Sequence, residues 1–484
     1  MNLQKLLVGI DINEQTYDQV KGLTVKGITD NSKKVKEGYL FVAIKGLNFD
    51  GHRGIDEALE NGAIGVIGEY DINDLKKPYI KVNNSRKVLG IIGKNFYRDP
   101  SKNKVVIGVT GTNGKTTVSY LLRFLLEQHG MSCGLIGTIK NTINGVDTAS
   151  INTTPSSLVM NELLSKSNDD VVILEVSSHG LTQYRLEGIE FDYCIFTNLT
   201  QDHLDYHGSM ENYFLAKKML FEKMKENGVA IINIDDIWGE KLEEILIRKK
   251  LNVYSVGQSS QACLRIAQIN SNINPDIKVR GNCGEFDISF SMEGTHNLYN
   301  AVIAFATVNQ FNFKVEDTLG AILNFPGVPG RFEKIKYRNG STVVIDYAHT
   351  ADAIFFCLNT AKELGAKKVT HVFGFRGNRD EKKRNEMLRI SSEMSDRYIL
   401  THDDLNTIQY EEMCQTLNEL NKQFGNEKGF IVNDRTLAIK HALDSSSENE
   451  WVVITGKGHE SYQQDYITPT TCDRETVMHF NSYL

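Results

Sequence analysis

The chain has 484 residues, 40% of them hydrophobic and 24% charged, and a formal net charge of −7. This length supports about two to four domains with a sizeable core. The acidic balance excludes a general nucleic-acid or membrane-surface binder, because both need basic surface. Scattered cysteines without a C-x-x-C pair, and a start without a signal-peptide pattern, favour a cytoplasmic protein with reduced thiols. We expect neither nucleic-acid binding nor membrane insertion.

Short apolar runs alternate with helical patterns along the chain. In chain order they are YLFVAI (39–44), VVIGVT (105–110), VVILEV (171–176), CIFTNL (194–199), VAIINI (229–234), VVIDYA (343–348), THVFGF (370–375) and WVVITG (451–456). Strands of this kind, separated by helices, indicate parallel or mixed sheets covered on both faces. Polar, proline-bearing segments divide the chain near residues 100 and 330. We therefore predict an α/β protein with domains at 1–100, 101–330 and 331–484.

A glycine-rich turn, TGTNGKTT (110–117), joins the strand at 105–110 to an amphipathic helix pattern. Backbone N–H groups of such a turn cradle phosphates, Lys115 would neutralise them, and the Thr116 hydroxyl would hold Mg²⁺. Val109 occupies the first glycine position of the usual spacing, so the alternative is a chance glycine turn. We predict ATP or GTP binding. The expected phosphate-binding residues are Gly111, Thr112, Asn113, Gly114, Lys115, Thr116 and Thr117.

Acidic and histidine side chains follow the next two strands. Glu175 ends the run at 171–176, where it would suit either a Mg²⁺ ligand or a cap for the next helix. The segment DHLDYH (202–207) adds two aspartates and two histidines. Because it lacks a helical H-E-x-x-H pattern, we do not predict zinc.

The turn TGTNGKTT resembles that of the Mur ligases, ATP-dependent amide-bond-forming enzymes of peptidoglycan precursor synthesis and cell-wall biogenesis. Further motifs resemble the MurE type, which adds the third residue of the peptide. The resemblance extends over nearly the whole chain, in the family's motif order. It implies a central P-loop mononucleotide-binding sheet, an N-terminal domain for the UDP-substrate and a Rossmann-like C-terminal domain for the amino acid. It also implies ATP as the nucleotide, and we expect the chain to act as a monomer.

For catalysis, the resemblance implies that His203 assists a second Mg²⁺ and that Lys217 is carbamylated. A partly neutral lysine adds CO₂ and becomes an anion, N6-carboxylysine, that helps to fix a magnesium. The alternative is a solvated helix lysine. The implied catalytic residues are Lys115, Glu175, His203 and Lys217, and the implied metal ligands are Thr116, Glu175, His203 and the Lys217 carbamate.

Other motifs imply contacts with the nucleotide and the acceptor. Near ATP they are Asn297 and Asn300 in HNLYN, Arg331 in GRFE and Asp346 in DYAHT. The implied contacts with the acceptor, UDP-N-acetylmuramoyl-L-alanyl-D-glutamate, are Ser32, Thr153, Thr154, Ser177, Gln183 and Arg185. Ordinary turn hydrogen bonding is the alternative for Ser177 and Thr153. The family's Asp-Ser-Arg reads Asn31-Ser32-Lys33 here, and lysine lacks arginine's planar grip, so an altered carrier is a further alternative.

Two motifs imply the amino-acid site. Arg379, in FRGNRDEKKRNEM, would pair with the α-carboxylate of the amino acid, although Arg376 stands where the family has glycine. Gly456 and Glu460, in TGKGHESYQ, would hold the far end of the amino acid.

The loop DDLN (403–406) aligns with the family's D-N-P-R, whose arginine grips the distal carboxylate of meso-diaminopimelate. Asn406 carries no charge, and an unpaired buried carboxylate would be costly. Asp403, Asp404 and Glu460 therefore favour an amine, and we predict L-lysine or L-ornithine. The alternative is that the aspartates cap the following helix.

We therefore predict an ATP-dependent ligase that adds such an amino acid to the UDP-muramoyl dipeptide through an acyl phosphate, giving ADP and phosphate. Because the departures from the family lie in substrate-choosing loops, the alternative enzyme is a MurE-like paralogue with another acceptor or amino acid. A nucleotide sensor without turnover would not need Glu175, His203 and Lys217. A folate-polyglutamate ligase shares the phosphate loop but lacks the N-terminal domain.

Overall fold

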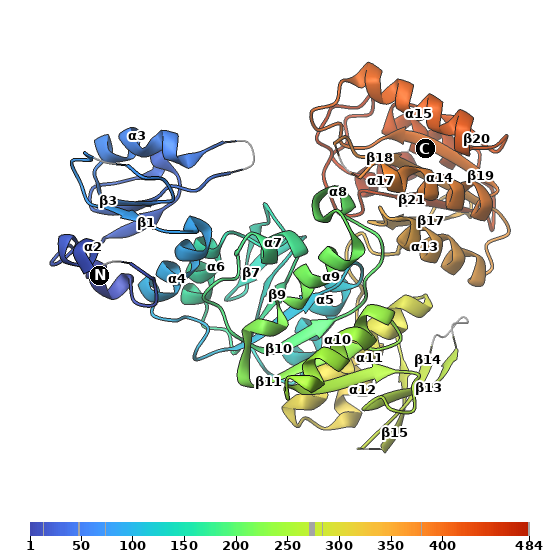
Figure 1. The fold of residues 1–484 in the computed structure, drawn as a ribbon. Coiled ribbons are helices and arrows are strands. Elements are labelled where there is room, and N and C mark those ends of the chain that lie inside the picture. The colour runs from blue at the N-terminus through green and yellow to red at the C-terminus, as the bar shows by residue number, and fades with distance from the viewer. Residues whose placement is uncertain are drawn as a thin grey trace. The chain divides into compact units, whose positions relative to one another are not determined.

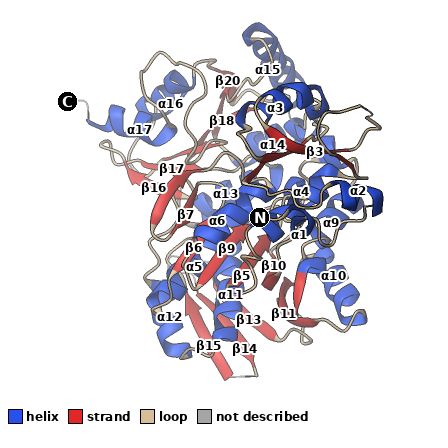
Figure 2. Cartoon of the chain, turned by 90° about the vertical axis from the view of Figure 1, so that its left-hand side faces the viewer, coloured by secondary structure: helices blue, strands red, loops and turns tan. Residues whose placement is uncertain are grey.

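The computed structural model describes residues 1–12, 14–46, 49–72, 74–270, 276–282, 284–378 and 380–482. Contacts within the chain separate two compact units. Unit 1 comprises Met1–Gly108, Met131–Cys194 and Ala216–Gly228, and unit 2 comprises Val109–Gly130, Ile195–Leu215 and Val229–Leu484. Figure 1 traces the chain by residue number, and Figure 2 distinguishes helices from strands. No helix within the described ranges combines the length and the apolar composition needed to cross a bilayer.

The N-terminal part of unit 1 folds around a small parallel sheet of order β1-β2-β3-β4. Alternate side chains of its strands serve two clusters: Leu40 and Val42 pack with α1 and α4, and Phe41 packs with α3, because successive strand residues point to opposite faces. The elements are α1 (Leu3–Leu6), α2 (Glu14–Gln19), β1 (Gly27–Thr29), β2 (Tyr39–Val42), α3 (Ile55–Glu60), β3 (Ala63–Gly68), β4 (Tyr79–Lys81) and α4 (Ser85–Phe96).

A mixed sheet of 11 strands follows, in the order β15-β14-β13-β12-β11-β10-β5-β9-β6-β7-β8. Its strands are β5 (Val105–Thr110), β6 (Cys133–Ile136), β7 (Lys140–Ile143), β8 (Val146–Ala149), β9 (Val171–Glu175), β10 (Phe191–Phe196), β11 (Met224–Asn233), β12 (Asn252–Gly257), β13 (Leu264–Asn270), β14 (Asp276–Gly281) and β15 (Gly284–Ser289). The helices of this segment are α5 (Lys115–Gln128), α6 (Ser157–Lys166), α7 (Ser178–Thr182), α8 (Leu204–His207), α9 (Met210–Lys218), α10 (Ile237–Arg248), α11 (Thr295–Val308) and α12 (Val315–Leu323). The predicted strand, glycine turn and helix are β5, the loop at 111–114 and α5.

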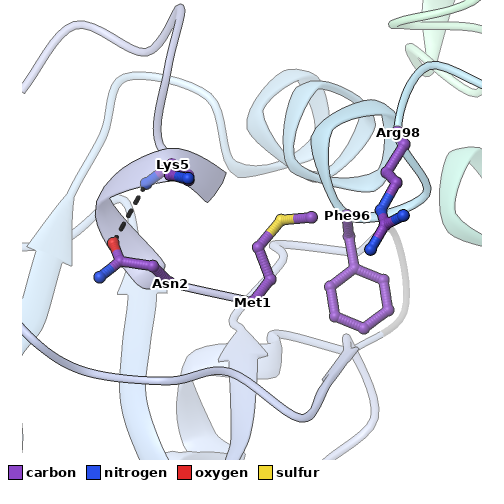
Figure 3. Close-up of a pocket in the computed structure, with 5 residues that line it drawn as sticks. All are labelled: Met1, Asn2, Lys5, Phe96 and Arg98. Atoms are coloured by element: carbon purple, nitrogen blue, oxygen red, sulfur yellow. Dashed lines mark hydrogen bonds between the residues drawn. The ribbon is translucent and has the colours of Figure 1, made fainter.

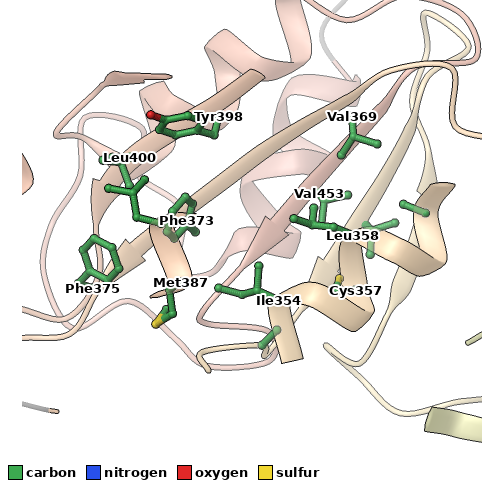
Figure 4. Packing of buried hydrophobic residues seen from close by; sticks show 14 of the residues in the cluster. Ile354, Cys357, Leu358, Val369, Phe373, Phe375, Met387, Tyr398, Leu400 and Val453 are labelled. Atoms are coloured by element: carbon green, nitrogen blue, oxygen red, sulfur yellow. The ribbon is translucent and has the colours of Figure 1, made fainter. Parts of the chain in front are cut away.

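The last part of unit 2 forms a six-stranded sheet of order β16-β17-β21-β18-β19-β20, in which only the β16 edge is antiparallel among the described pairs. The elements are β16 (Glu333–Lys336), β17 (Thr342–Asp346), α13 (Ala351–Glu363), β18 (Val369–Phe375), α14 (Lys382–Met394), β19 (Arg397–His402), α15 (Tyr410–Phe424), β20 (Gly429–Ile431), α16 (Arg435–Asp444), β21 (Trp451–Thr455) and α17 (Asp473–Ser482). Helices α13 and α14 bury Ile354 and Met387 against Phe373 and Leu400 on one face (Figure 4). Helices α16 and α17 pack on the alternate strand side chains.

These sheets confirm the predicted α/β class with mixed and parallel strands. The predicted boundaries near residues 100 and 330 stay a prediction, because the contacts separate two units rather than three domains.

Candidate active site

The phosphate loop of unit 2 needs two glycines. Gly111 has a φ of +153° and Gly114 a φ of +86°, which side chains disfavour. A Cβ atom on Gly111 would meet Thr197 Oγ1 at 1.9 Å, and one on Gly114 would meet Asn300 Oδ1 at 2.4 Å. The predicted glycine turn is therefore enforced both by its dihedral angles and by its close neighbours.

Asn198, which is not among the predicted site residues, holds this loop. Its backbone oxygen accepts a hydrogen bond from Thr112 N–H at 2.9 Å, and its Oδ1 accepts one from Asn113 N–H at 2.9 Å. The sequence could have indicated Asn198 by its position two residues after the end of β10, where polar side chains reach the edge of a parallel sheet. Lys115 adds its charge to the same loop, since its Nζ donates to Gly111 O at 2.9 Å and Thr112 O at 2.8 Å.

Arg331 reaches the phosphate loop from the segment before β16. Its Nη2 donates to Thr116 Oγ1 at 3.1 Å, and its guanidinium carbon lies 4.5 Å from the centroid of the Tyr347 ring. Asp346 Oδ2 accepts from Phe332 N–H at 2.6 Å, and burial raises the pKa of this aspartate. Arg331 and Thr116, two residues predicted to contact ATP, thus lie together, while Asp346 holds the segment that carries Arg331.

The two asparagines predicted near the adenine begin α11. Asn300 Nδ2 donates to Asn297 Oδ1 at 3.2 Å, and both side chains are buried. Between them, Tyr299 OH donates to Asp235 Oδ2 at 2.6 Å and accepts from Gln258 Nε2 at 2.9 Å. This polar group was missed because its three members are far apart in sequence.

His203 adopts a left-handed backbone after β10, with a φ of +54°. Its Nε2 lies 3.3 Å from Asp202 Oδ2, and the same carboxyl group meets His349 Nε2 at 3.8 Å and Lys383 Nζ at 3.1 Å. Burial alone would raise the pKa of Asp202, but these partners hold it well below its usual value. Asp202 therefore ties the His203 loop to two residues from beyond position 330.

Glu175 ends β9 in unit 1 and is fully buried. Thr138 holds its carboxylate with two hydrogen bonds, from N–H to Oε1 at 3.2 Å and from Oγ1 to Oε2 at 2.7 Å. The N-cap of α7 is Ser177, whose Oγ accepts from Gly180 N–H at 3.1 Å. Glu175 is therefore no helix cap, and the sequence missed Thr138 as its positioning residue.

Most of the predicted acceptor contacts meet in unit 1 near the ends of β9 and α7. Thr154 Oγ1 donates to Glu175 O at 2.9 Å and lies 3.1 Å from Ser177 Oγ. Arg185 donates from Nη1 to Thr154 O at 2.7 Å and from Nη2 to Gln183 Oε1 at 2.8 Å. The turn hydrogen bonding considered for Ser177 is present, so its hydroxyl serves the fold as well as any ligand.

Two N-terminal features lie outside this group of contacts. Ser32 Oγ donates to Glu57 Oε2 at 2.5 Å, and Asn31 caps the short 3₁₀ helix Ser32–Lys34. A cavity of about 560 Å³ opens elsewhere in unit 1 (Figure 3), and its lining includes no predicted site residue. The residues that line it are Met1, Asn2, Lys5, Phe96 and Arg98.

Lys217 is 1% exposed, whereas the adjacent Lys218 forms an ion pair with Glu222. This burial excludes the alternative of a solvated helix lysine. Moving an ammonium group out of water is costly, so the site favours either a charge partner or a neutral amine that can add CO₂.

The acidic pair after β19 is also buried. Lys457 Nζ lies 2.5 Å from Asp404 Oδ1 and 3.6 Å from Asp403 Oδ1. Burial alone would raise the pKa of Asp403, but neighbouring cations, with Arg376 first, lower it to about 2. Neither aspartate caps the next helix, because the N-cap of α15 is Gln409. The carboxylates predicted to face an amine are thus already paired within the chain.

The other residues predicted for the amino acid are also engaged. Glu460 forms an ion pair with Arg376, whose Nη2 also donates to Gly456 O at 3.1 Å. Asn406 Nδ2 donates to the backbone oxygen of Gly377 at 2.6 Å. Arg379, the predicted α-carboxylate contact, lies outside the described residues.

Among the described residues, no three His, Cys, Asp or Glu side chains form a group that could hold a metal. The implied metal set offers instead a hydroxyl, a carboxylate, an imidazole and, after CO₂ addition, a carbamate. The three oxygen donors in this set suit Mg²⁺, which keeps several waters and takes further ligands from phosphates. Thr116 and His203 belong to unit 2, and Glu175 and Lys217 to unit 1.

Replacing Thr138 with valine should weaken the orientation of Glu175 with little change of shape. We expect the Mg²⁺ concentration for half-maximal rate to rise about 10- to 100-fold, as for other residues that orient a ligand. Titration of phosphate release against Mg²⁺ measures this, with Thr148→Val on the exposed strand β8 as the matched control. An unchanged Mg²⁺ requirement would show that Thr138 does not serve the metal.

Comparison with known proteins places these features in a family. Three domain families match the chain: Mur ligase family, catalytic domain, at residues 24–97; Mur ligase middle domain at 109–308; and Mur ligase, glutamate ligase domain, at 330–458. A Clostridium botulinum relative is 36% identical over 472 residues, which cover 96% of this chain and 95% of that protein. An Aquifex aeolicus relative is 40% identical over 446 residues, which cover 91% and 90%.

Both relatives are named UDP-N-acetylmuramoyl-L-alanyl-D-glutamate–2,6-diaminopimelate ligase. A solved structure of a ligase with the same name is 28% identical to this chain, with a TM-score of 0.69. The match covers 99% of this chain and 98% of that structure.

Proposed function

Because this chain belongs to the Mur ligase family and is an ATP-dependent amide ligase of the MurE type, we propose that it joins a diamino acid to UDP-N-acetylmuramoyl-L-alanyl-D-glutamate. The observation that carries the proposal is the contact between Arg331 and Thr116 of the phosphate loop. It joins two motifs that the family uses for ATP, in a chain similar throughout to relatives named for this reaction. The product would serve peptidoglycan synthesis.

The proposed chemistry has two balanced steps. A carboxylate of the acceptor attacks the γ-phosphorus of ATP, which forms an acyl phosphate and releases ADP. The amine of the amino acid then attacks the acyl carbon, loses a proton and releases phosphate. Lys115 and Arg331 would bind the phosphates in both steps, and positioning would account for much of the rate.

Two Mg²⁺ ions would screen the repulsion between the phosphates and the attacking carboxylate. The proposed ligands are Thr116, Glu175, His203 and the carbamate of Lys217. The chain's own contribution is to orient these donors, as Thr138 does for Glu175.

The structure removes one of the arguments for L-lysine or L-ornithine as the added amino acid. Asp403 and Asp404 have partners in Lys457 and Arg376, so the uncharged Asn406 is the main remaining argument for it. The relatives' names favour a different amino acid, 2,6-diaminopimelate. All three candidates are diamino acids, and L-lysine differs from diaminopimelate by one distal carboxylate.

A substrate panel tests the proposal. We expect the purified protein with Mg-ATP and UDP-N-acetylmuramoyl-L-Ala-D-Glu to release phosphate only when a diamino acid is added, with the ligated mass seen by mass spectrometry. The panel should include L-lysine, L-ornithine, meso-diaminopimelate and L-alanine as the control. Silence with every amino acid, while ATP still binds, would contradict the proposed acceptor and implicate Asn31 and Lys33 in choosing another carrier.

A further inference from the structure

Arg376 follows directly after β18, and its neighbours hold its side chain in a defined position. The guanidinium forms an ion pair with Glu460, and its Nε lies 3.6 Å from Asp403 Oδ2. Its central carbon lies 5.5 Å from the centroid of the Tyr347 ring, whose hydroxyl donates to Glu460 Oε1 at 3.1 Å. Arg376 is therefore a fixed part of the amino-acid site rather than a surface side chain.

The turn that carries Arg376 is bonded directly to the loop that carries Asn406. Gly377 N–H donates to Asp404 O at 2.9 Å, and Asn406 Nδ2 donates to Gly377 O at 2.6 Å. A Cβ atom on Gly377 would meet Leu405 O at 2.0 Å, which shows how closely the two segments pack. An arginine side chain on either segment would therefore lie at the same end of the proposed amino-acid site.

Exposure separates the charges here into two groups. The side chains of Asp403, Asp404 and Lys457 are 1%, 5% and 0% exposed. Arg376 and Glu460 keep 17% and 26% exposure. The solvent-accessible charges of this cluster are therefore the guanidinium of Arg376 and the carboxylate of Glu460, which lie side by side.

An adjacent cation and anion complement a group that carries both charges. In an α-amino acid, the ammonium and the carboxylate sit on one carbon, so the ammonium can pair with Glu460 while the carboxylate accepts hydrogen bonds from Arg376. A bare ammonium would also meet Glu460 but would lie close to the guanidinium, and like charges at short range disfavour binding.

Resting on the proposed function, we propose that Arg376 determines the specificity of the amino-acid site. With Glu460 it reads the distal ammonium and carboxylate of a diamino dicarboxylic acid such as meso-diaminopimelate. It supplies from the 376–378 turn the positive charge that Asn406 lacks. This proposal predicts a preference for meso-diaminopimelate, whereas the sequence predicted L-lysine or L-ornithine, so substrate preference distinguishes the two predictions.

The test compares kcat/KM for meso-diaminopimelate and L-lysine in the wild-type protein, three variants and one control variant. For Arg376→Met we expect meso-diaminopimelate to lose about 10- to 100-fold, the loss typical of a hydrogen bond to a charged group, mainly through KM. The value for L-lysine should not fall under the same conditions, because the change removes a like charge close to its distal ammonium. Arg376→Lys keeps the charge without the planar fork and should fall between.

The double variant Arg376→Gly with Asn406→Arg moves the guanidinium to the other segment and should restore use of meso-diaminopimelate. Arg389→Met is the matched control, because this α14 arginine is 62% exposed and forms only long ion pairs, with Glu386 at 3.6 Å and Glu393 at 3.7 Å. A wild-type preference for L-lysine, or equal losses for both amino acids in Arg376→Met, would overturn this inference and leave the proposed function standing. No turnover with any amino acid would overturn the proposed function, and the inference with it.

Discussion

Replacing Lys217 with alanine is expected to lower kcat by roughly 10³-fold, the largest effect of the changes considered. The reason is that the carbamate would contribute a fixed negative group to the metal site, and alanine provides neither charge nor oxygen donors. Because Lys217 is 1% exposed, truncating it to alanine leaves a space inside the protein that only a small group can fill. Short carboxylic acids such as formate or acetate should restore part of the rate by supplying the missing carboxylate.

Phosphate release at saturating substrates, with and without added acetate, measures this effect. Lys218→Ala is the matched control, since the neighbouring lysine pairs with Glu222 and should lose little activity. A carbonyl resonance from ¹³C-labelled bicarbonate should appear in the wild-type protein and be absent from Lys217→Ala. Unchanged turnover in Lys217→Ala would show that no carbamate serves the reaction.

Replacing Lys115 with methionine is expected to lower kcat/KM for ATP by about 10²- to 10³-fold. Its ammonium group lies over the loop carbonyls of Gly111 and Thr112, where it would meet the phosphates of the nucleotide. Methionine keeps the length of the side chain, so helix α5 should form as before. The change therefore removes charge from the loop with little effect on its shape.

Initial rates across an ATP series, with nucleotide affinity measured by calorimetry, separate binding from chemistry. Arg123→Met on the same helix is the control, because Arg123 pairs with Glu127 across one turn at 2.8 Å and such surface pairs contribute little. Both variants should unfold at temperatures close to that of the wild type. Equal ATP affinity and rate in Lys115→Met would contradict the assignment of this loop to the phosphates.

The features that the sequence predicted correctly depend on interactions between residues close together in the chain. Alternating apolar strands and helices indicated the α/β fold, and TGTNGKTT indicated a phosphate loop, because dihedral preferences and burial periodicity act over a few neighbouring residues. The same turn and its companion motifs identified the family. Gly111 and Gly114 then proved to be required by their dihedral angles and neighbours.

The partners of charged side chains were decided only by the tertiary structure. Lys457 and Asp404 are 53 residues apart in sequence, Arg376 and Glu460 are 84 apart, and Thr138 and Glu175 are 37 apart. The sequence showed an acidic pair at 403–404 but not the buried cations that neutralise it, and this is why it predicted an amine as the ligand. Strand register and loop closure bring such groups together, and the cost of burying an unpaired charge then determines which of them must pair.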